Sequence, residues 1–319
     1  MENNKIVTME SSVDASMFEV VGQDLDSLNE MSRPSISFWK DAFGRIKRDK
    51  VTMFFLTVLI IITTLSFLIP AIWPVAMNTQ NYAYTNAAPF TSTGDHIFIF
   101  GTDVLGRDLF VRAFDGGRVS LTIAYVAVVI NCVVGVCYGG IAGYFGGMLD
   151  NVMMRFVEIL NGIPYLLLVI VFMIVLEPGM TTIIVAYSVV GWAGMARLVR
   201  GEVMRLKQQE FVICASTMGA SSARIIFRHL VPNILSLVVV NLTLQIPSII
   251  FTEAFLSFIG LGVVLPQASW GTLANEGIAS FQRYPYQLII PAVLISITML
   301  SFNLVGDRLR DAFDPKLRR

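Results

Sequence analysis

Four polar side chains recur along one of the most apolar stretches of the sequence. Asn241, Gln245, Ser248 and Thr252 are separated by four, three and four residues, a spacing that places them on one face of an α-helix. Pro247 lies in the same stretch and can kink the helix. Because amide and hydroxyl groups are costly to place against lipid, this face either hydrogen-bonds to neighbouring helices or lines a water-filled passage. Both interpretations stay open at this point.

A helix–glycine–helix pattern precedes that stretch. Phe211, Ala215 and Met218 share one helical face, and Gly219 can adopt the left-handed conformation that ends a helix. Ser221 or its neighbour can cap the helix that follows. An apolar helical face needs a partner, either the protein's own helices or another protein.

Motifs for covalent chemistry are absent from the sequence. No Gly-Lys pair occurs, so there is no phosphate-binding P-loop, and neither HExxH nor GxSxG is found. The two histidines, His96 and His229, are too far apart to suggest a metal site. The three cysteines, Cys132, Cys137 and Cys214, imply no disulfide framework. We expect no catalytic residue and no metal ligand.

Glu253 is the main candidate for an ionisable group inside a membrane. From Leu230 to Glu253 a helix rises about 35 Å, more than the hydrocarbon thickness of roughly 30 Å. We therefore expect Glu253 at the outer water interface, in a structural role, and the proton site is the alternative.

The composition is that of a membrane protein. Of 319 residues, 55% are hydrophobic and 14% are charged, whereas soluble domains carry about 25% charged residues. The formal net charge of zero does not suggest nucleic-acid binding. A helix needs about 20 apolar residues to cross a bilayer. Six apolar runs, free of charged residues except for Glu253 in the fifth, qualify or nearly qualify: residues 51–73, 119–144, 159–176, 180–196, 230–255 and 286–305.

Basic residues predict the direction of these six spans. With the N-terminus in the cytosol, 19 of the 23 Lys and Arg residues lie inside and four lie outside. Both termini are then cytoplasmic, residues 74–118 form an external loop, and residues 197–229 form a cytoplasmic connection. Residues 1–50 form a cytoplasmic tail, ending either in an amphipathic helix on the inner membrane surface (38–50) or in a simple basic stop.

The cytoplasmic connection resembles the EAA loop of permease subunits of ABC importers. That pattern reads Glu-Ala-Ala, three residues, Gly, then about ten residues to Leu-Pro. Here Ile213, Cys214 and Ala215 take the lead positions, followed by Gly219 and, later, Pro232. The first two lead positions and the residue before the proline depart from the pattern, so there is no Glu at position 213.

The chain resembles the C-type permease subunits of dipeptide and oligopeptide importers more closely than it resembles ABC permeases in general. Over residues 95–319 five of their phrases recur in order: FGTDVLGRDLFVRAFDGGRVSL (100–121), YFGGMLDNVMMR (144–155), GASSARIIFRHLVPN (219–233), EAFLSFIGLG (253–262) and NLVGDRLRDAFDP (303–315). The resemblance implies an all-α, polytopic protein with six transmembrane helices in residues 51–319, the type I ABC importer permease fold, in a bacterial cell membrane.

The resemblance also implies a function and partners. The chain would be a non-catalytic permease subunit that forms half of a peptide translocation path and works by alternating access between two conformations. Its partners would be a sister permease, two cytoplasmic ATPases that bind ATP and Mg²⁺, an extracytoplasmic peptide-binding protein, the peptide and membrane lipid. The chain itself would bind no cofactor.

Two sets of residues carry this expectation. The contact to the ATPases is expected at Phe211, Cys214, Ala215, Met218, Gly219, Ala220, Ser221 and Arg224. The path is expected at Asn241, Gln245, Ser248 and Thr252. Three alternatives stay open: an importer of nickel or another small solute in the same family, a stand-alone secondary transporter or channel, and an intramembrane enzyme.

Overall fold

The structure is a computed structural model that describes residues 38–94, 96–264 and 267–313. The chain divides into two compact units, residues 1–41 and 42–319. Of the first unit, residues 38–41 are described, as the start of helix α2. The expected tail before residue 38 and the basic residues after 313 lie outside the described residues.

The described chain is built almost entirely from helices. In order, the elements are α2 (Phe38–Arg48), α3 (Lys50–Ile72), η2 (Tyr82–Tyr84), β1 (Thr91–Ser92), β2 (Ile97–Phe98), α4 (Leu109–Phe145), α5 (Gly147–Asn161), α6 (Tyr165–Leu176), α7 (Met180–Val190), α8 (Trp192–Leu206), α9 (Glu210–Thr217), α10 (Ser222–Arg224), η3 (Ile225–Leu230), α11 (Val231–Phe258), α12 (Trp270–Ser280) and α13 (Tyr286–Phe313). The two strands pair antiparallel, with Thr91 opposite Phe98.

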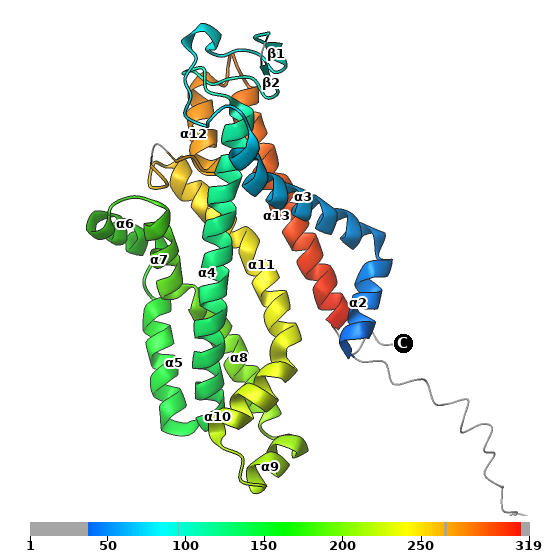
Figure 1. Cartoon of the computed structure of the whole chain (residues 1–319). Helices are drawn as coiled ribbons and strands as arrows, with labels where there is room; N and C mark the ends of the chain where they lie inside the picture. Colours follow the sequence, from blue (N-terminus) through cyan, green and yellow to red (C-terminus); the bar gives the residue numbers. More distant parts are fainter. Residues whose placement is uncertain (1–37, 95, 265–266, 314–319) are drawn as a thin grey trace, which may run out of the picture. The chain divides into compact units, whose positions relative to one another are not determined.

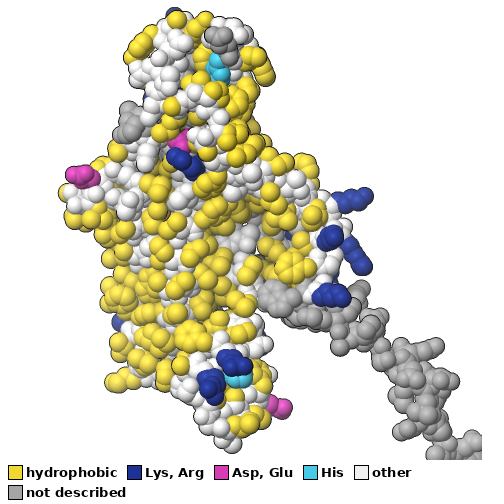
Figure 2. Space-filling view, in the orientation of Figure 1, with side chains coloured by type: hydrophobic (Ala, Val, Ile, Leu, Met, Phe, Trp, Pro, Cys, Tyr) yellow, Lys and Arg dark blue, Asp and Glu magenta, His cyan; other side chains and the backbone are white. Residues whose placement is uncertain are grey.

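The long helix α4 connects the two ends of the second unit. The strands and α12 lie near its first residues, whereas α9 and α10 lie near its last residues (Figure 1). The largest apolar cluster gathers side chains from α3, α4, α6, α7, α11 and α13 around α4. A second cluster joins α8, α9, η3 and α11 near the α9 end. Hydrophobic side chains also cover much of the outer face of the helices (Figure 2), as expected of a membrane-embedded body.

Five helical segments of the described chain are long and apolar enough to cross a membrane. They are Lys50–Ile72, Leu109–Phe145, Met180–Leu206, Ser222–Phe258 and Tyr286–Phe313. A bent pair, α5 and α6, passes the same test together, so the expected six spans result if this pair counts as one.

The expected third span, residues 159–176, is not a single helix. The chain bends by 79° between α5 and α6. The bend lies at Gly162, Ile163 and Pro164, because proline has no N–H to continue the helix and disfavours helical backbone at the residue before it. The sequence analysis also missed the helical turns that precede residue 159, since charged side chains interrupt the apolar run there.

Two expected boundaries move because helices are longer than their charge-free runs. Helix α4 begins at Leu109, where Asp108 accepts a hydrogen bond from Phe110 N at 2.9 Å. The predicted external loop 74–118 therefore ends ten residues early. The expected fourth span, 180–196, continues to Leu206, because Gly191 keeps helical backbone between α7 and α8 (φ −60°). The first ten residues of the connection 197–229 are thus helical.

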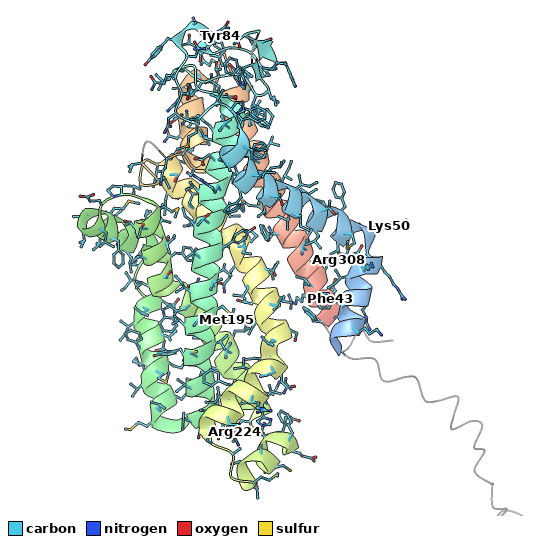
Figure 3. All side chains as sticks on the ribbon, in the orientation of Figure 1. Phe43, Lys50, Tyr84, Met195, Arg224 and Arg308 are labelled. Atoms are coloured by element: carbon cyan, nitrogen blue, oxygen red, sulfur yellow. The ribbon has the colours of Figure 1, made fainter. Side chains whose placement is uncertain are left out.

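Asp49 separates the predicted amphipathic helix from the first span. α2 ends at Arg48, and Asp49 caps α3 by accepting hydrogen bonds from Thr52 Oγ1 (2.7 Å) and Val51 N (3.0 Å). The hydrogen bond from Thr52 lowers the pKa of the Asp49 carboxyl. Arg308 of α13 lies beside this junction, 3.5 Å from Asp49 (Figure 3). The helix within residues 38–50 is confirmed, and its place on a membrane surface stays a prediction.

Candidate coupling segment and polar face

The turn after α9 has the conformation that the sequence predicts. Gly219 has a φ of +82°, in the left-handed region. Ala220 N donates to Ala215 O and Gly219 N donates to Ser216 O, both at 3.0 Å. These two bonds make a complete Schellman motif, in which the glycine satisfies the last carbonyls of the helix. Ser221 then caps α10, accepting from Arg224 N at 3.4 Å.

One face of α9 is open to solvent. Met218 is 88% exposed and Phe211 is 41% exposed, and Cys214 is an exposed free cysteine. Ala215 differs from expectation, because it is half-buried and packs on the second apolar cluster instead of on the open face. Ala220 is likewise half-buried in that cluster.

This open face lies at the end of the unit that is remote from the strands. Arg224 is beside the turn, whereas Tyr84 lies at the opposite end (Figure 3). Lys, Arg and His side chains gather at the α9 end (Figure 2). An apolar helical face surrounded by cations is a surface that a protein partner can cover.

The other face of α9 is anchored to the transmembrane helices. Val212 is 3% exposed and belongs to the cluster that includes Val203 of α8, Ile226 of η3 and Val238 of α11. A displacement of α9 therefore acts on α8 and α11 together. η3 is a π-helical turn between α10 and α11, a rare conformation that often marks functional positions in helices.

The polar face of α11, defined as Asn241, Gln245, Ser248 and Thr252, lies at the surface of this subunit. Ser248 is exposed and the other three are half-buried. Gln245 Nε2 donates to Asn241 Oδ1 (2.7 Å), and Thr252 Oγ1 donates to Ser248 O (2.7 Å). Within the described residues, the side-chain hydrogen bonds of this face stay on α11. The roles weighed for this face, contact between helices and the lining of a passage, both stay predictions.

Glu253 is buried instead of meeting water. It is 1% exposed, although it lies near the end of α11 as expected. Ser120 of α4 donates to Glu253 Oε2 at 2.6 Å, and Ser257 donates to Oε1 at 2.8 Å. Trp270 N of α12 donates to Ser120 Oγ at 3.3 Å. The carboxyl group thus ties α4, α11 and α12 together, as the expected structural role requires, whereas the expected contact of Glu253 with water is wrong.

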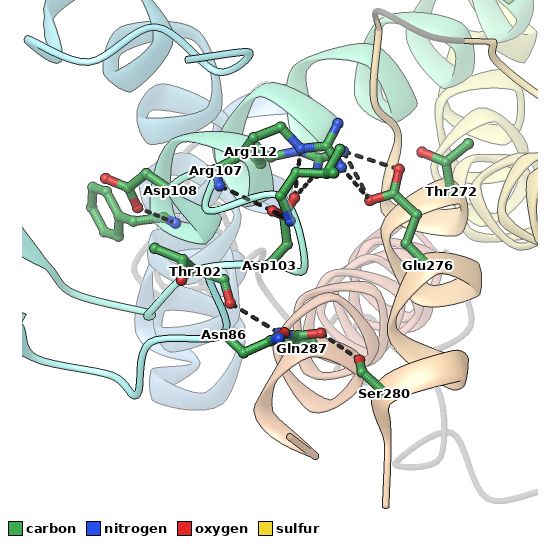
Figure 4. A network of polar contacts seen from close by, with 12 residues as sticks. Asn86, Thr102, Asp103, Arg107, Asp108, Arg112, Thr272, Glu276, Ser280 and Gln287 are labelled. Atoms are coloured by element: carbon green, nitrogen blue, oxygen red, sulfur yellow. Dashed lines mark hydrogen bonds and ion pairs between the residues drawn. The ribbon is translucent and has the colours of Figure 1, made fainter. Parts of the chain in front are cut away.

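The structure also shows an ion network that sequence reasoning missed. Arg107 donates from Nε to Asp103 Oδ2 at 2.6 Å and from Nη2 to Glu276 Oε2 at 3.1 Å. Arg112 contacts the same two carboxylates, with Nη2 lying 3.1 Å from Glu276 Oε1. These four residues, the ion network, fasten the loop before α4 to α12 (Figure 4).

Hydrogen bonds extend the ion network to α13. Gln287 Nε2 donates to Thr102 O and to Asn86 Oδ1, each at 2.9 Å, and Gln287 also accepts from Ser280 of α12 (Figure 4). Asp103 is 4% exposed and Arg112 is 1% exposed, so their charges are stabilised by each other and not by water. At this end of the subunit the loop before α4, α12 and α13 are therefore joined by polar contacts.

Within the described residues there is no group of three or more His, Cys, Asp or Glu side chains that could hold a metal ion. The carboxylates of the ion network, Asp103 and Glu276, both contact Arg107 and Arg112. The site thus consists of one helix with an exposed apolar face, α9, and one polar helical face, on α11.

Comparison with known proteins gives two family matches. The pattern described as "Binding-protein-dependent transport system inner membrane component" matches residues 135–319. The pattern described as "N-terminal TM domain of oligopeptide transport permease C" matches residues 37–89. Together the two patterns cover most of the chain.

Curated relatives match along nearly the full length. The oligopeptide transport system permease protein OppC of Bacillus subtilis is 44% identical, covering 97% of this chain and 99% of its own. The dipeptide transport system permease protein DppC of the same organism is 45% identical, covering 91% and 90%. OppC of Haemophilus influenzae is 40% identical, covering 94% and 96%.

Among solved structures, a chain of the MetNI methionine ABC transporter, titled as inward facing, is 19% identical. It covers 62% of this chain and 94% of its own, with a TM-score of 0.49.

Proposed function

The chain belongs to the family of binding-protein-dependent transport system inner membrane components, and from that membership we propose its function. It is the membrane-spanning, non-catalytic permease subunit of an ATP-driven importer of oligopeptides or dipeptides. The observation that carries this proposal is 44% identity to an oligopeptide permease over 97% of the chain. The exposed face of α9 and the polar face of α11 supply the two contacts that the function needs.

The subunit couples ATP hydrolysis to transport through α9. Two cytoplasmic ATPases, with ATP and Mg²⁺ bound to them, cover the exposed face formed by Phe211, Cys214 and Met218. Because the buried side of α9 packs on α8 and α11, a movement of the ATPases shifts the balance between the two conformations of the permease. The chain transmits this movement through its own residues and performs no covalent chemistry.

The polar face of α11 lines half of the translocation path. Its partly exposed amide and hydroxyl groups meet a sister permease across a wet passage. Peptides carry many backbone donors and acceptors, which such groups can bind weakly. Weak contacts suit a path, because tight binding would slow release.

The orientation follows from the charge distribution. The α9 end carries the basic connection and faces the cytosol, with both termini on that side. The end with the ion network faces outward, toward an extracytoplasmic peptide-binding protein. The protein lies in a bacterial cell membrane.

Uptake by the reconstituted complex tests this function. The chain is purified with its sister permease, both ATPases and the binding protein, and is placed in lipid vesicles. We expect ATP-dependent accumulation of labelled dipeptides or oligopeptides, lost when any one subunit is left out. Labelled Ni²⁺ in place of peptide is the matched control.

Cys214 provides a direct test of the ATPase contact. With Cys132 and Cys137 replaced by Ser, Cys214 should crosslink to an ATPase through a short thiol-reactive reagent. A version that keeps only Cys132, which is half-buried in α4, is the control and should not crosslink. Accumulation of Ni²⁺ but not peptide, or uptake by the chain alone, would contradict the proposal.

A further inference from the structure

A bidentate ion pair joins the first turn of α5 to the middle of α8. Arg200 donates from Nε to Asp150 Oδ1 and from Nη2 to Asp150 Oδ2, each at 2.5 Å. Asp150 is 4% exposed, and the side chain of Arg200 is 32% exposed. Two parallel hydrogen bonds fix orientation as well as distance. Neither residue belongs to α9, the polar face or the ion network.

The pair spans a glycine corner. α4 joins α5 through Gly146 and Gly147, whose φ values are +66° and +59°. A Cβ added to either glycine would meet nothing within 4 Å, and backbone hydrogen bonds from Gly146 N to Ala142 O and from Asp150 N to Gly146 O cross the corner. Glycine backbone has many accessible conformations. The bidentate contact of Asp150 with Arg200 is therefore the charged side-chain contact that fixes the start of α5 to α8.

α8, by contrast, is held tightly against α4. A Cβ added to Gly135, Gly139 or Gly143 of α4 would lie 2.6, 2.3 or 2.7 Å from an atom of α8. Such close approach prevents α8 from sliding along α4 without a collision. α8 also leads into α9 after only three residues, 207–209. A displacement of α9 consequently moves α8 and the adjacent half of α4 as one body.

The middle of α5 has only apolar and single hydrogen-bond contacts to this body. Val157 is fully buried against Trp192 and Ala196 of α8, and Tyr138 of α4 donates to Met153 O at 2.9 Å. Apolar contacts let helices rotate on each other, whereas a bidentate pair does not. Beyond α5 the chain turns by 79° into α6, so a small swing of α5 becomes a large displacement of α6.

We propose that Asp150 and Arg200 are positioning residues for transport. Their ion pair makes the start of α5 move together with α8 when the ATPases displace α9. The proposal rests on the proposed function, because it takes α9 as the ATPase contact. The alternative is that the pair only stabilises the folded subunit.

Spin-label distances test the proposal without a transport assay. Met148 of α5 and Met204 of α8 are 85% and 41% exposed, so Met148→Cys and Met204→Cys accept labels in a chain whose three native cysteines are replaced by Ser. In the complete complex we expect one narrow distance, the same with and without a non-hydrolysable ATP analogue. Asp150→Asn should broaden or shift it. A nucleotide-dependent distance with the pair intact, or an unchanged narrow distance in Asp150→Asn, would overturn the proposal.

Uptake and ATP hydrolysis separate positioning from stability. Asp150→Asn should lower peptide uptake by about tenfold, because a neutral amide cannot accept both hydrogen bonds from Arg200 and so no longer fixes the orientation of α5 on α8. Complex yield and basal hydrolysis should stay unchanged, and stimulation by binding protein and peptide should be lost. Arg200→Lys keeps the charge but loses the bidentate contact. Its peptide uptake should lie between that of wild type and that of Asp150→Asn.

Glu158→Gln is the matched control, because it breaks an exposed ion pair with Arg155 on the same helix (2.8 Å, 59% and 77% exposed). It should leave uptake and hydrolysis unchanged. A fall in uptake that only follows a fall in complex yield would assign the pair to stability and overturn positioning. If wild type assembles with no ATPase or imports no peptide, the proposed function fails, whereas the nucleotide-free label distances still decide whether the pair holds the corner.

Discussion

Replacing Gly219 with Val is the sharpest perturbation of the coupling segment. The residue has a φ of +82°, which is accessible to glycine but strained for a β-branched side chain. A Cβ at this position would meet nothing within 4 Å. The whole effect of the substitution therefore comes from backbone strain and none from a clash, which makes its size calculable.

The chain can respond to Gly219→Val in two ways. Keeping the left-handed conformation costs about 1–3 kcal/mol. Leaving it breaks the two hydrogen bonds of the Schellman motif, from Ala220 N to Ala215 O and from Gly219 N to Ser216 O, at a net cost of about 0.5–1.5 kcal/mol each. The two costs are similar, so the end of α9 samples conformations in which the Schellman hydrogen bonds are broken. If this cost weakens the coupling between α9 and the ATPases, a loss of about 1–3 kcal/mol corresponds to a 5–150-fold fall in the population of α9 conformations that can dock.

Proteoliposome uptake and ATP hydrolysis measure this effect. We expect Gly219→Val to insert and to assemble, to keep basal hydrolysis by the ATPases, and to lose peptide uptake together with stimulation by binding protein. Gly219→Asn is the matched control, since asparagine tolerates the left-handed region, and it should retain most of the activity. Uptake by Gly219→Val within about twofold of wild type, a difference below 0.5 kcal/mol, would refute the reasoning.

Three further outcomes follow from the path, the orientation and the ion network. Gln245→Leu should lower peptide uptake while complex yield stays constant; loss of assembly without a transport defect in the remaining complex would instead assign the polar face to subunit contact. In a cysteine-free chain on whole cells, Asn81→Cys should react with an impermeant thiol reagent and Lys316→Cys should not; reaction at both sites, or at 316 only, contradicts cytoplasmic termini. Arg112→Met should destabilise the subunit by about 1–3 kcal/mol, because Arg107 alone then has to neutralise both Asp103 and Glu276, whereas combining it with Glu276→Gln should recover part of the loss in a thermal unfolding assay.

The helices and the Gly219 turn could be predicted because they depend on local rules. A charge-free run of about 20 residues suffices to identify a span, and a glycine between two helical patterns suffices to identify the turn. The boundaries were less predictable, since helices continue past their apolar cores. The bend at Pro164 could have been predicted from the effect of proline on a helix. It was missed because the span was assigned only from the length of its charge-free run.

The ion network could not be predicted because it is a tertiary contact. Arg107 and Glu276 are 169 positions apart in the sequence, and nothing in either local pattern pairs them. The one signal in the sequence was the position of three of the four residues. Asp103, Arg107 and Arg112 all lie within residues 100–121, a phrase that resembles peptide permeases. Glu253 shows the same limit, since helix rise predicts depth along the axis but not which neighbour covers a side chain.

The distribution of polar contacts along α4 indicates how movement passes through the subunit. Helix α4 has 37 residues and is about 55 Å long. Near its first residues, Arg112 is held by two carboxylates from the loop and α12. Near its last residues the glycines lock it to α8 and hence to α9. One end of α4 is thus fixed by charges and the other is attached to α9, the proposed ATPase contact, so we expect a displacement of α9 to pivot α4 about its charged end. The largest movement is then expected beside the half of α11 that lies nearer α9. Opening and closing of the path at that end requires no break in the ion network, so the buried charges can stay paired throughout the cycle.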